Sequence, residues 1–583
     1  MERKILNIFL ISLVANFISS QEDIIFSKES GFYATEFLLE LSTSSKSLKI
    51  FYTIDGTDPT NSTTAKEYIE PIQIIDRSHK PNYYSNYEED LDSPLSISKS
   101  FFGRYKKPPF LIEKAMVIRA VSKNGKNYGN IISKTYFITE EELSQFERYT
   151  VVSLVTNPDN LFDPEKGIYV LGNIYMEWKK TNNFNQNEEE YFDVEGNCYM
   201  RGSEWEREAS LSIFEKGKMT INQNVGIRIK GYSSRDLPQK SFHVFARKKY
   251  GKKKIKSSTL FPNNKDMYGN PIIEYDSISL RAIPDEERSR DFFVNRIIYK
   301  RNLTSTYDMK ESFLFLNGEF WGMYVITEKF SDKFFLSHYN IPKDDLLYNK
   351  DAEFDEKTPQ EIINIYNFMD LYATKDLSND IHYNEVCKVI DIDSLIELYS
   401  IGIYISNTDW PGHNFGIWKY NGNNKTSDNI YYNGKWRFMI YDFDYSMGNV
   451  LEGDFGTLES YQYDMFSFVD DSKNSHPTNL FISLFRNKKF KSKFIKSYEN
   501  FVDNAMSMNI INPIIKYFKE EISYFIGYSY MRWYGYLGGS KEETIIEGMS
   551  NYKNKIIPQL KKYYEERPKY TLKNMENYLS KFE

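Results

Sequence analysis

The sequence predicts an α+β protein in which a small β-sandwich precedes a larger domain. Short apolar, partly alternating runs separated by turn residues fill the first part of the chain, and apolar residues at helical spacing dominate from about residue 380. Strands followed by helices are typical of an α+β domain. At 583 residues the chain also exceeds what one hydrophobic core usually serves, so we expect two domains.

The first residues have the pattern of a secretory signal peptide. Two basic residues lie within residues 1–4, an apolar stretch follows over residues 5–17, and small residues precede Gln21. The stretch is short for a membrane span, although an uncleaved anchor is the alternative. We therefore expect residues 1–20 to be removed from a secreted, extracellular protein, free or associated with the cell surface, with no stable membrane insertion after cleavage.

Composition narrows the classes of function. The net charge is −7, which argues against nucleic-acid binding because that requires a basic face. Cys198 and Cys387 are the two cysteines, so at most one disulfide can form and a zinc module built on paired cysteines is excluded. Asn-x-Ser/Thr triplets at Asn61, Asn302 and Asn424 are compatible with a secreted glycoprotein.

The first predicted domain spans residues 22–140 and consists of short strands. We expect one hairpin from residues 37–42 and 48–54, and a second from residues 115–121 and 131–137 across an Asn-Gly turn. A polar insertion separates the two hairpins. Regularly spaced strands without helical patterns predict a β-sandwich.

A turn cluster in this region resembles a known module. Ile50-Phe-Tyr-Thr-Ile-Asp-Gly-Thr-Asp-Pro59, preceded by Phe26–Tyr33, is similar to the chitobiase/β-hexosaminidase C-terminal-type domain with its YTxDGxxP turn. The resemblance implies an Ig-like accessory sandwich without catalytic residues. Tyr52, Tyr83 and Tyr84 are candidates for a glycan contact, although packing is the more common role of such tyrosines.

The second predicted domain spans residues 150–570. Its first strand covers residues 149–155, and residues 226–245 have the pattern of strand, tight turn and strand. Apolar residues at helical spacing then predict helices, for example over residues 393–405 and 480–485.

The densest polar constellation lies in the C-terminal half. Asp409 and Asn414 have the D-x-x-x-x-N spacing of a kinase catalytic loop, in which the carboxylate orients the acceptor hydroxyl and the Asn oxygen binds Mg²⁺. A predicted hairpin over residues 415–441 then leads to Asp442-Phe-Asp444. Clustered carboxylate and amide oxygens suit Mg²⁺ or Mn²⁺ on nucleotide phosphates. The alternative is that Asp442 caps a turn and Asn414 is a hydrogen-bonded core amide.

The tight turn upstream offers a place for phosphate. Gly231, Ser233 and Ser234 can present backbone N–H groups to phosphate oxygens, and Arg235 and Lys240 can add positive charge. An ordinary hairpin with solvated basic residues is the alternative. The order along the chain, phosphate loop, lysine and acidic site, is the order that a nucleotide kinase needs.

Several ordered motifs resemble the CotH kinase family, the spore-coat-type atypical protein kinases, over roughly residues 150–570. The resemblance implies an atypical protein-kinase-like fold, with a β-rich N-lobe and a helical C-lobe, that uses ATP and Mg²⁺ (or Mn²⁺). The motifs are Gly226-Ile-Arg-Ile-Lys-Gly-x-Ser-Ser-Arg-x-x-Pro-Gln-Lys-Ser241, Leu280-Arg-Ala-Ile-Pro with Arg290–Arg296, Leu316-Asn-Gly-Glu-Phe-Trp-Gly followed by Glu328, and the two acidic segments.

The resemblance implies roles for the acidic residues. Asp409 is the catalytic-loop carboxylate, Asp442 is catalytic as the principal metal ligand, and Asn414 and Asp444 complete the metal ligands. Asp444 stands where ordinary kinases have Gly, and the sequence has no H-R-D triplet. The CotH kinase family shares this departure, so it does not by itself imply inactivity.

The resemblance also implies cofactor-binding residues. Arg235 and Lys240 would hold the nucleotide phosphates. Asp291 would pair with Lys240, as the glutamate of the αC helix does in ordinary kinases. Glu328 would be either a hinge residue or a carboxylate that supports the site.

The expected function is therefore a secreted Ser/Thr protein kinase acting on extracellular, cell-surface or spore-coat proteins. The main alternative is a non-catalytic surface or adhesion protein that keeps the kinase-like scaffold. A carbohydrate-active enzyme with Asp409 and Asp442 as paired carboxylates is a third option, which would require them to lie roughly 5–9.5 Å apart.

Overall fold

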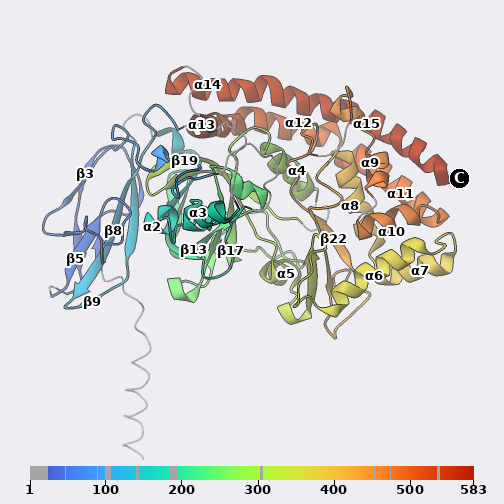
Figure 1. Ribbon diagram of the computed structural model, residues 1–583, viewed down its shortest axis with the longest axis horizontal. Helices are drawn as coiled ribbons and strands as arrows, with labels where there is room; N and C mark the ends of the chain where they lie inside the picture. The colour runs from blue at the N-terminus through green and yellow to red at the C-terminus, as the bar shows by residue number, and fades with distance from the viewer. Residues whose placement is uncertain are drawn as a thin grey trace, which may run out of the picture.

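In this computed structural model, strands predominate in the N-terminal half of the chain and helices in the C-terminal half, and the last helices extend over the strands (Figure 1). The protein is therefore α+β, as predicted. The predicted signal peptide and Asn302 lie outside the described residues. In the described part of the chain, no helix is both long and apolar enough to span a membrane. The structure describes residues 24–45, 47–87, 90–98, 105, 107–139, 144–182, 194–301, 306–451, 455–472, 475–534 and 539–582.

The N-terminal strands enclose a small core of their own, which includes Ile118, Ala120 and Tyr136, all fully buried. The main sheet runs β2 (Gly31–Tyr33), β10 (Ile132–Ile138), β8 (Met116–Asn124), β5 (Lys49–Thr53) and β6 (Lys66–Glu67), and β9 (Asn127–Tyr128) pairs with β8. Two further sheets of two strands each belong to the same module. They pair β1 (Ile24–Phe26) with β4 (Leu41–Thr43), and β3 (Phe37–Leu39) with β7 (Ile72–Ile74).

The pairing corrects one of the two predicted hairpins. β8 and β10 are antiparallel neighbours, which confirms the second hairpin. The first is wrong, because β4 pairs with β1 whereas β5 pairs with β8. β8 offers β5 five residues in register, from Lys49 opposite Lys123 to Thr53 opposite Arg119. Each strand of the predicted hairpin therefore pairs with a strand more distant in the sequence, and not with its neighbour across the predicted turn.

A closed barrel follows the N-terminal sheets. Its last strand returns to its first in parallel, with Val151 opposite Phe313. Alternation along β13 places Ile227 and Ile229 in the barrel core and turns Arg228 and Lys230 to the other face. The strand order is β11 (Thr150–Val155), β12 (Arg207–Glu215), β13 (Lys218–Lys230), β14 (Ser241–Phe245), β17 (Ser277–Ala282), β19 (Glu319–Thr327) and β18 (Met309–Leu316).

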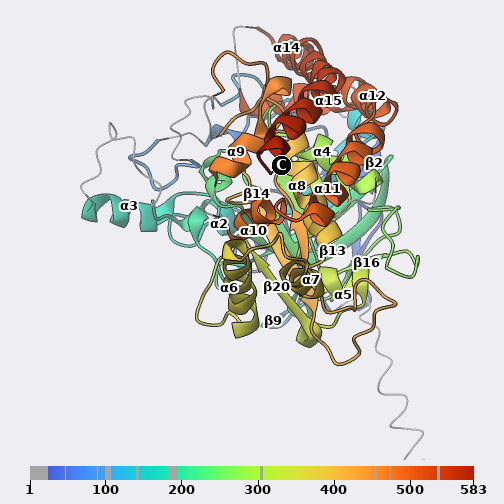
Figure 2. The same ribbon diagram turned by 90° about the vertical axis from the view of Figure 1, so that its right-hand side faces the viewer.

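Short elements connect these strands. α2 (Asp159–Phe162) and α3 (Gly172–Thr181) follow β11, and α3 projects away from the helical part in Figure 2. β15 (Ile255–Lys256) and β16 (Glu274–Tyr275) pair between β14 and β17. Cys198 and Cys387 are both free thiols.

The remainder is mostly helical, and α12 to α15 lie along the top of both side views (Figures 1 and 2). A sheet of β20 (Leu346–Lys350), β21 (Phe415–Tyr420) and β22 (Arg437–Ile440) lies within it. The helices are α4 (Ser289–Lys300), α5 (Asp332–Tyr339), α6 (Gln360–Thr374), α7 (Asp380–Val389), α8 (Ile392–Tyr404), α9 (Met465–Asp471), α10 (His476–Leu484), α11 (Lys488–Asn500), α12 (Met508–Tyr517), α13 (Ser523–Trp533), α14 (Lys541–Asn551) and α15 (Ile557–Leu579).

Buried contacts join the N-terminal sheets to the barrel. The carboxylate of Glu319, at the start of β19, accepts hydrogen bonds from the backbone N–H of Tyr83 at 2.6 Å and of Ser85 at 2.9 Å. The Ser85 hydroxyl donates to the same carboxylate at 2.8 Å. The ring of Phe137 on β10 also packs edge-on against Phe315 on β18. The turn between β18 and β19 is thus anchored by the N-terminal module.

The same contacts bear on the glycan candidates. Tyr84 is buried, its hydroxyl donates to the Asp55 carbonyl, and its ring stacks on Phe162. Tyr83 is 68% exposed, whereas Tyr52 is partly buried. The three tyrosines therefore do not form one exposed platform.

The Glu319 contact generates a stability prediction. Replacing Glu319 with Ala leaves the buried amide and hydroxyl of Ser85 and the partly buried amide of Tyr83 without an acceptor, so we expect the free energy of unfolding to fall by about 2–4 kcal/mol. Urea unfolding followed by circular dichroism measures it. Glu70→Ala, at an exposed position of the same module, should change the value by less than about 0.5 kcal/mol. Equal stabilities of the two variants would contradict the anchoring role.

Candidate active site

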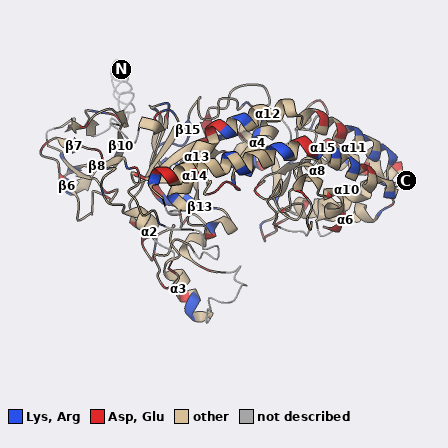
Figure 3. Cartoon of the chain, turned by 90° about the horizontal axis from the view of Figure 1, so that it is seen from above, with Lys and Arg blue, Asp and Glu red and all other residues tan. Residues whose placement is uncertain are grey.

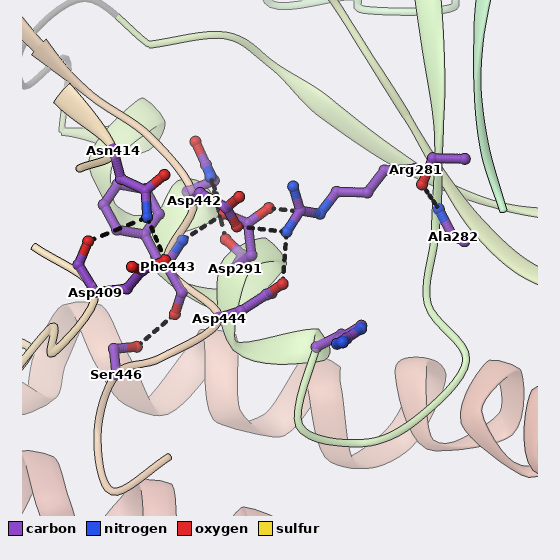
Figure 4. Close-up of polar contacts among 12 residues, drawn as sticks. Arg281, Ala282, Asp291, Asp409, Asn414, Asp442, Phe443, Asp444 and Ser446 are labelled. Carbon is purple, nitrogen blue, oxygen red and sulfur yellow. Dashed lines mark hydrogen bonds and ion pairs between the residues drawn. The ribbon is translucent and has the colours of Figure 1, made fainter. Parts of the chain in front are cut away.

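Arg281 on β17 joins three carboxylates (Figure 4). Its Nε lies 3.2 Å from Oδ2 of Asp291. Its Nη2 donates to Oδ1 of Asp442 and to Oδ2 of Asp444, in each case at 2.7 Å. Asp291 comes from the first turn of α4, and the other two follow β22. Barrel, helix and sheet therefore meet at one guanidinium, and we call these four residues the acidic centre.

The backbone at Asp442 and Asn414 has an unusual conformation that orients their side chains. Asp442 has φ +63° and Asn414 has φ +62°, the left-handed region that Asn and Asp tolerate better than most residues. The turn at Asp442 is held by Phe443, whose backbone N–H donates to Oδ1 of Asp291 at 2.9 Å. Asp291 thus supports both the charge and the backbone of the Asp442 segment.

Asp409 and Asn414 form a pair beside the acidic centre. The Asn414 amide Nδ2 donates to Oδ2 of Asp409 at 2.7 Å, so the Asn414 amide oxygen is left to accept. The backbone N–H of Tyr441 donates to the Asn414 carbonyl at 3.2 Å, which ties the pair to the end of β22. The structure therefore brings Asp409, Asn414, Asp442 and Asp444 together, as the sequence predicted.

The charges of the acidic centre are strongly coupled. Burial alone would lower the pKa of Arg281, but the three neighbouring carboxylates raise it well above its ordinary value. Burial would raise the pKa of Asp442, yet Arg281 lowers it below its ordinary value. For Asp444, burial raises the pKa to about 7 against the pull of Arg281, and Asp442 adds to the rise. At neutral pH Asp442 is therefore ionised while Asp444 is near its titration midpoint.

Lys230 is the basic neighbour of this centre that the sequence analysis missed. Burial, followed by Arg281, lowers its pKa to about 8, while Asp442, Asp291 and Asp444 oppose the shift. Lys350, at the end of β20, has a pKa of about 8 mainly because of burial, and Lys230 is among its neighbours. The alternation of β13 is the sequence signal for Lys230, since Ile229 faces the barrel core and Lys230 cannot.

Two predicted phosphate-binding residues are placed elsewhere. The guanidinium of Arg235, 5% exposed, donates to the carbonyls of Gly231, Cys198 and Ile229, each at 2.7 Å. The ammonium of the fully buried Lys240 donates to the carbonyls of Arg235 at 2.5 Å and Leu237 at 3.0 Å. The assignment of both side chains to phosphates is therefore corrected: they hydrogen-bond backbone carbonyls, those of its own turn for Lys240 and those of the turn, of β13 and of Cys198 for Arg235, and such carbonyls would be costly to bury unpaired.

The predicted partner of Asp291 is also corrected. Its described ion pair is with Arg281, whereas the Lys240 ammonium donates to the carbonyls of Arg235 and Leu237. Glu328 is 5% exposed and contacts Nε2 of His338 at 3.0 Å and Nδ2 of Asn264 at 2.5 Å. It stands where the chain leaves β19 for α5, outside the acidic centre.

The oxygen atoms at the centre fit a hard divalent cation. Arg281 takes one oxygen each of Asp442 and Asp444, and the buried Oδ1 of Asp444 has no hydrogen-bond donor within the described residues. The Asp442 side chain is 41% exposed. No described group of three or more His, Cys, Asp or Glu residues is placed to hold a metal alone. Mg²⁺ commonly takes only one or two protein carboxylates and completes its ligands with phosphate and water, so this donor set suits it.

A cavity of about 1130 Å³ lies apart from the acidic centre. Arg296 on α4, Glu311 on β18 and Arg437 on β22 are among the residues that line it. None of the predicted site residues lines this cavity, so it is a separate feature of the fold.

Two family models match separate parts of the chain. A family model described as CotH kinase protein matches residues 227–571, more than half of the chain, and this span includes Lys230 and the whole acidic centre. A model described as chitobiase/beta-hexosaminidase C-terminal domain matches residues 28–84. No curated protein matches this chain.

The raised pKa of Asp444 generates a prediction about pH. Between the ordinary Asp value of about 4 and about 7, the native state holds a proton that the unfolded chain has released, so Asp444 lowers the free energy of unfolding as pH rises through this window. We therefore expect Asp444→Asn to gain stability relative to the parent as pH rises from about 4 to about 7, with no further gain above. Urea unfolding across this range checks it. A stability difference that is independent of pH would contradict the placement of Asp444.

Proposed function

Because the chain belongs to the CotH kinase protein family, we propose that it is an atypical protein kinase that transfers the γ-phosphate of ATP to Ser or Thr of secreted, cell-surface or spore-coat proteins. The observation that carries the proposal is the Arg281 centre, which sets Asp442 and Asp444 beside the Asp409–Asn414 pair. Kinase catalysis consists largely of positioning and electrostatic stabilisation, and this arrangement supplies both.

Each residue has a definite role in the proposal. Asp409 accepts a hydrogen bond from the acceptor hydroxyl and orients it. Asp442 and Asn414 would hold the metal, and Asp444 would support it from the buried side. When bound, Mg²⁺ or Mn²⁺ would supply the positive charge that neutralises the phosphates. Lys230 contacts the phosphates in the role that the sequence suggested for Lys240.

The proposal extends to the arrangement of the chain. The barrel acts as the N-lobe and the helical part as the C-lobe, and residues 328–331 between β19 and α5 act as the connection. Secretion through residues 1–20 places the enzyme outside the cell, where its acceptors are secreted or surface proteins. The N-terminal module, which matches a domain of carbohydrate-active proteins, would keep the enzyme near glycans.

One observation favours the alternative of a non-catalytic surface protein with the same scaffold. Arg281 already occupies an oxygen of both Asp442 and Asp444, which lowers the number of oxygens free for a metal. Nucleotide binding separates the two functions: a kinase should gain thermal stability with ATP and Mg²⁺, because ligand binding stabilises the folded state. Absence of a shift with either metal would favour the alternative.

The first catalytic prediction concerns Asp442. We expect Asp442→Ala to lower transfer of label from ATP by at least about 100-fold, because a principal electrostatic group is lost. Incubation of the full chain with labelled ATP and Mg²⁺ or Mn²⁺ measures it. Asp428→Ala, at an exposed position of the same β21–β22 hairpin, should retain full activity. Equal labelling by parent and Asp442→Ala would sink the assignment.

The second catalytic prediction concerns Lys230. Since its pKa is about 8, we expect kcat/KM for ATP to fall as pH rises through about 8, where the lysine loses its charge. Lys230→Gln should lower kcat/KM at least about tenfold at neutral pH and lose this step in the pH profile. Lys218→Gln, at the exposed far end of the same strand, is the matched control. An unchanged profile in Lys230→Gln would remove the lysine from the site.

A further inference from the structure

An unusually basic loop follows β14. Residues 247–256, Arg-Lys-Lys-Tyr-Gly-Lys-Lys-Lys-Ile-Lys, contain seven basic residues and no acidic one, although the whole chain has a net charge of −7. On the C-terminal helices, by contrast, basic and acidic residues alternate (Figure 3). We call residues 247–256 the basic loop.

Neighbouring carboxylates neutralise only part of this loop. Glu206 is shared, 2.9 Å from Nε of Arg247 and 3.1 Å from Nζ of Lys249. Arg228 of β13 takes the same carboxylate at 2.8 Å. Lys254 and Lys256 pair with acidic residues near β16, each at 2.5 Å. Positive charge therefore exceeds negative charge at this surface.

Three lysines of the loop face solvent without a carboxylate. Lys248, Lys252 and Lys253 are exposed, and none has an ion pair in the part of the chain that the structure describes. Lys252 contacts only a backbone carbonyl, that of Asn222, at 3.4 Å. These three ammonium groups are free to meet an anionic partner.

The base of the loop is fixed. The side chains of Arg228, Arg247 and Lys329 lie around the ring of Phe245, at 4.9, 4.7 and 5.1 Å from its centroid. Glu206, whose side chain is fully buried, also accepts a hydrogen bond from the Tyr250 hydroxyl at 3.1 Å. The backbone that carries Lys248 is therefore anchored on both sides, at Arg247 and at Lys249.

The basic loop lies within reach of the acidic centre. Ser241, at the start of β14, hydrogen-bonds the backbone of Ala282, which adjoins Arg281. The loop begins beyond Phe245, at the other end of this five-residue strand. At a rise of about 3.3 Å per residue, the loop starts about 15–20 Å from the acidic centre, and Lys252, beside Asn222 of β13, lies about 25 Å along that strand from Lys230. An extended peptide of roughly five to eight residues covers that distance.

We propose that the basic loop is a docking surface for an acidic, Asp- and Glu-rich segment of the acceptor protein, about five to eight residues from the phosphorylated Ser or Thr. The proposal rests on the proposed kinase function. A short acidic segment matches one loop in which three lysines have no ion pair within the described residues, whereas a long polyanion such as nucleic acid would also meet the net negative charge of the rest of the chain.

Binding of two fluorescent peptides to the full chain tests this proposal. Both carry one Ser; one has a run of Glu six residues away, and the other has Gln in its place. We expect the Glu peptide to bind more tightly, and K248Q/K252Q/K253Q to weaken it about tenfold, as the loss of three exposed ion pairs implies. K488Q/K496Q/K573Q removes the same charge from exposed positions on α11 and α15 and should leave binding unchanged.

Three results would overturn the proposal: equal affinity for the two peptides, equal weakening by the two triple variants, or a heparin fragment that binds the basic loop more tightly than the Glu peptide. The ATP-induced thermal shift, measured on the same proteins, reports the kinase function separately. A shift in all variants with no peptide preference would mean that docking fails while nucleotide binding stands. A peptide preference without any ATP-induced shift would mean that docking stands while nucleotide binding fails.

Discussion

The guanidinium of Arg281 is the contact on which the candidate site depends. Asp291 comes from α4, Asp442 and Asp444 follow β22, and three carboxylates brought together would repel each other without a cation between them. Arg281 lies on β17, a strand of the closed barrel, so the barrel fixes the position of its guanidinium in the site. Asp442 stays ionised as a result, while Asp444 holds its proton to about pH 7.

The N-terminal module contributes to the same rigidity. Glu319 opens β19, the strand that pairs with β17 through Arg281 opposite Val325. Its carboxylate is held by amides of the N-terminal module, so this module supports the barrel at the turn before that strand. We infer that a chain lacking the N-terminal module would lose part of the support for Arg281 as well.

Local patterns in the sequence predicted the acidic residues, whereas tertiary contacts decided their partners. The spacing of Asp409 and Asn414 and the position of Asp442 after a strand are local, so these residues were found. Lys240 was predicted to bind phosphate because it lies between the tight turn and the acidic residues in the sequence. That order does not determine the direction in which its side chain points. The structure turns it onto backbone carbonyls of its own turn.

Other parts of the site follow the same division. Alternation along β13 contained the signal for Lys230, since its neighbour Ile229 is a core residue. Arg281 was within a recognised motif, yet its role depends on α4 and on the residues after β22, which no spacing rule connects. The predicted hairpin between residues 37–42 and 48–54 failed for a related reason, because strands distant in the sequence offered better partners.

A crystal structure of the full chain with Mg²⁺ and a non-hydrolysable ATP analogue tests the central claim most directly. We expect metal density at Asp442 and Asn414, phosphate oxygens within hydrogen-bond distance of Lys230, and Arg281 still bound to Asp291. Nucleotide bound in the separate cavity beside Arg296 and Arg437, or phosphates contacting Arg235 and Lys240 instead of Lys230, would contradict it.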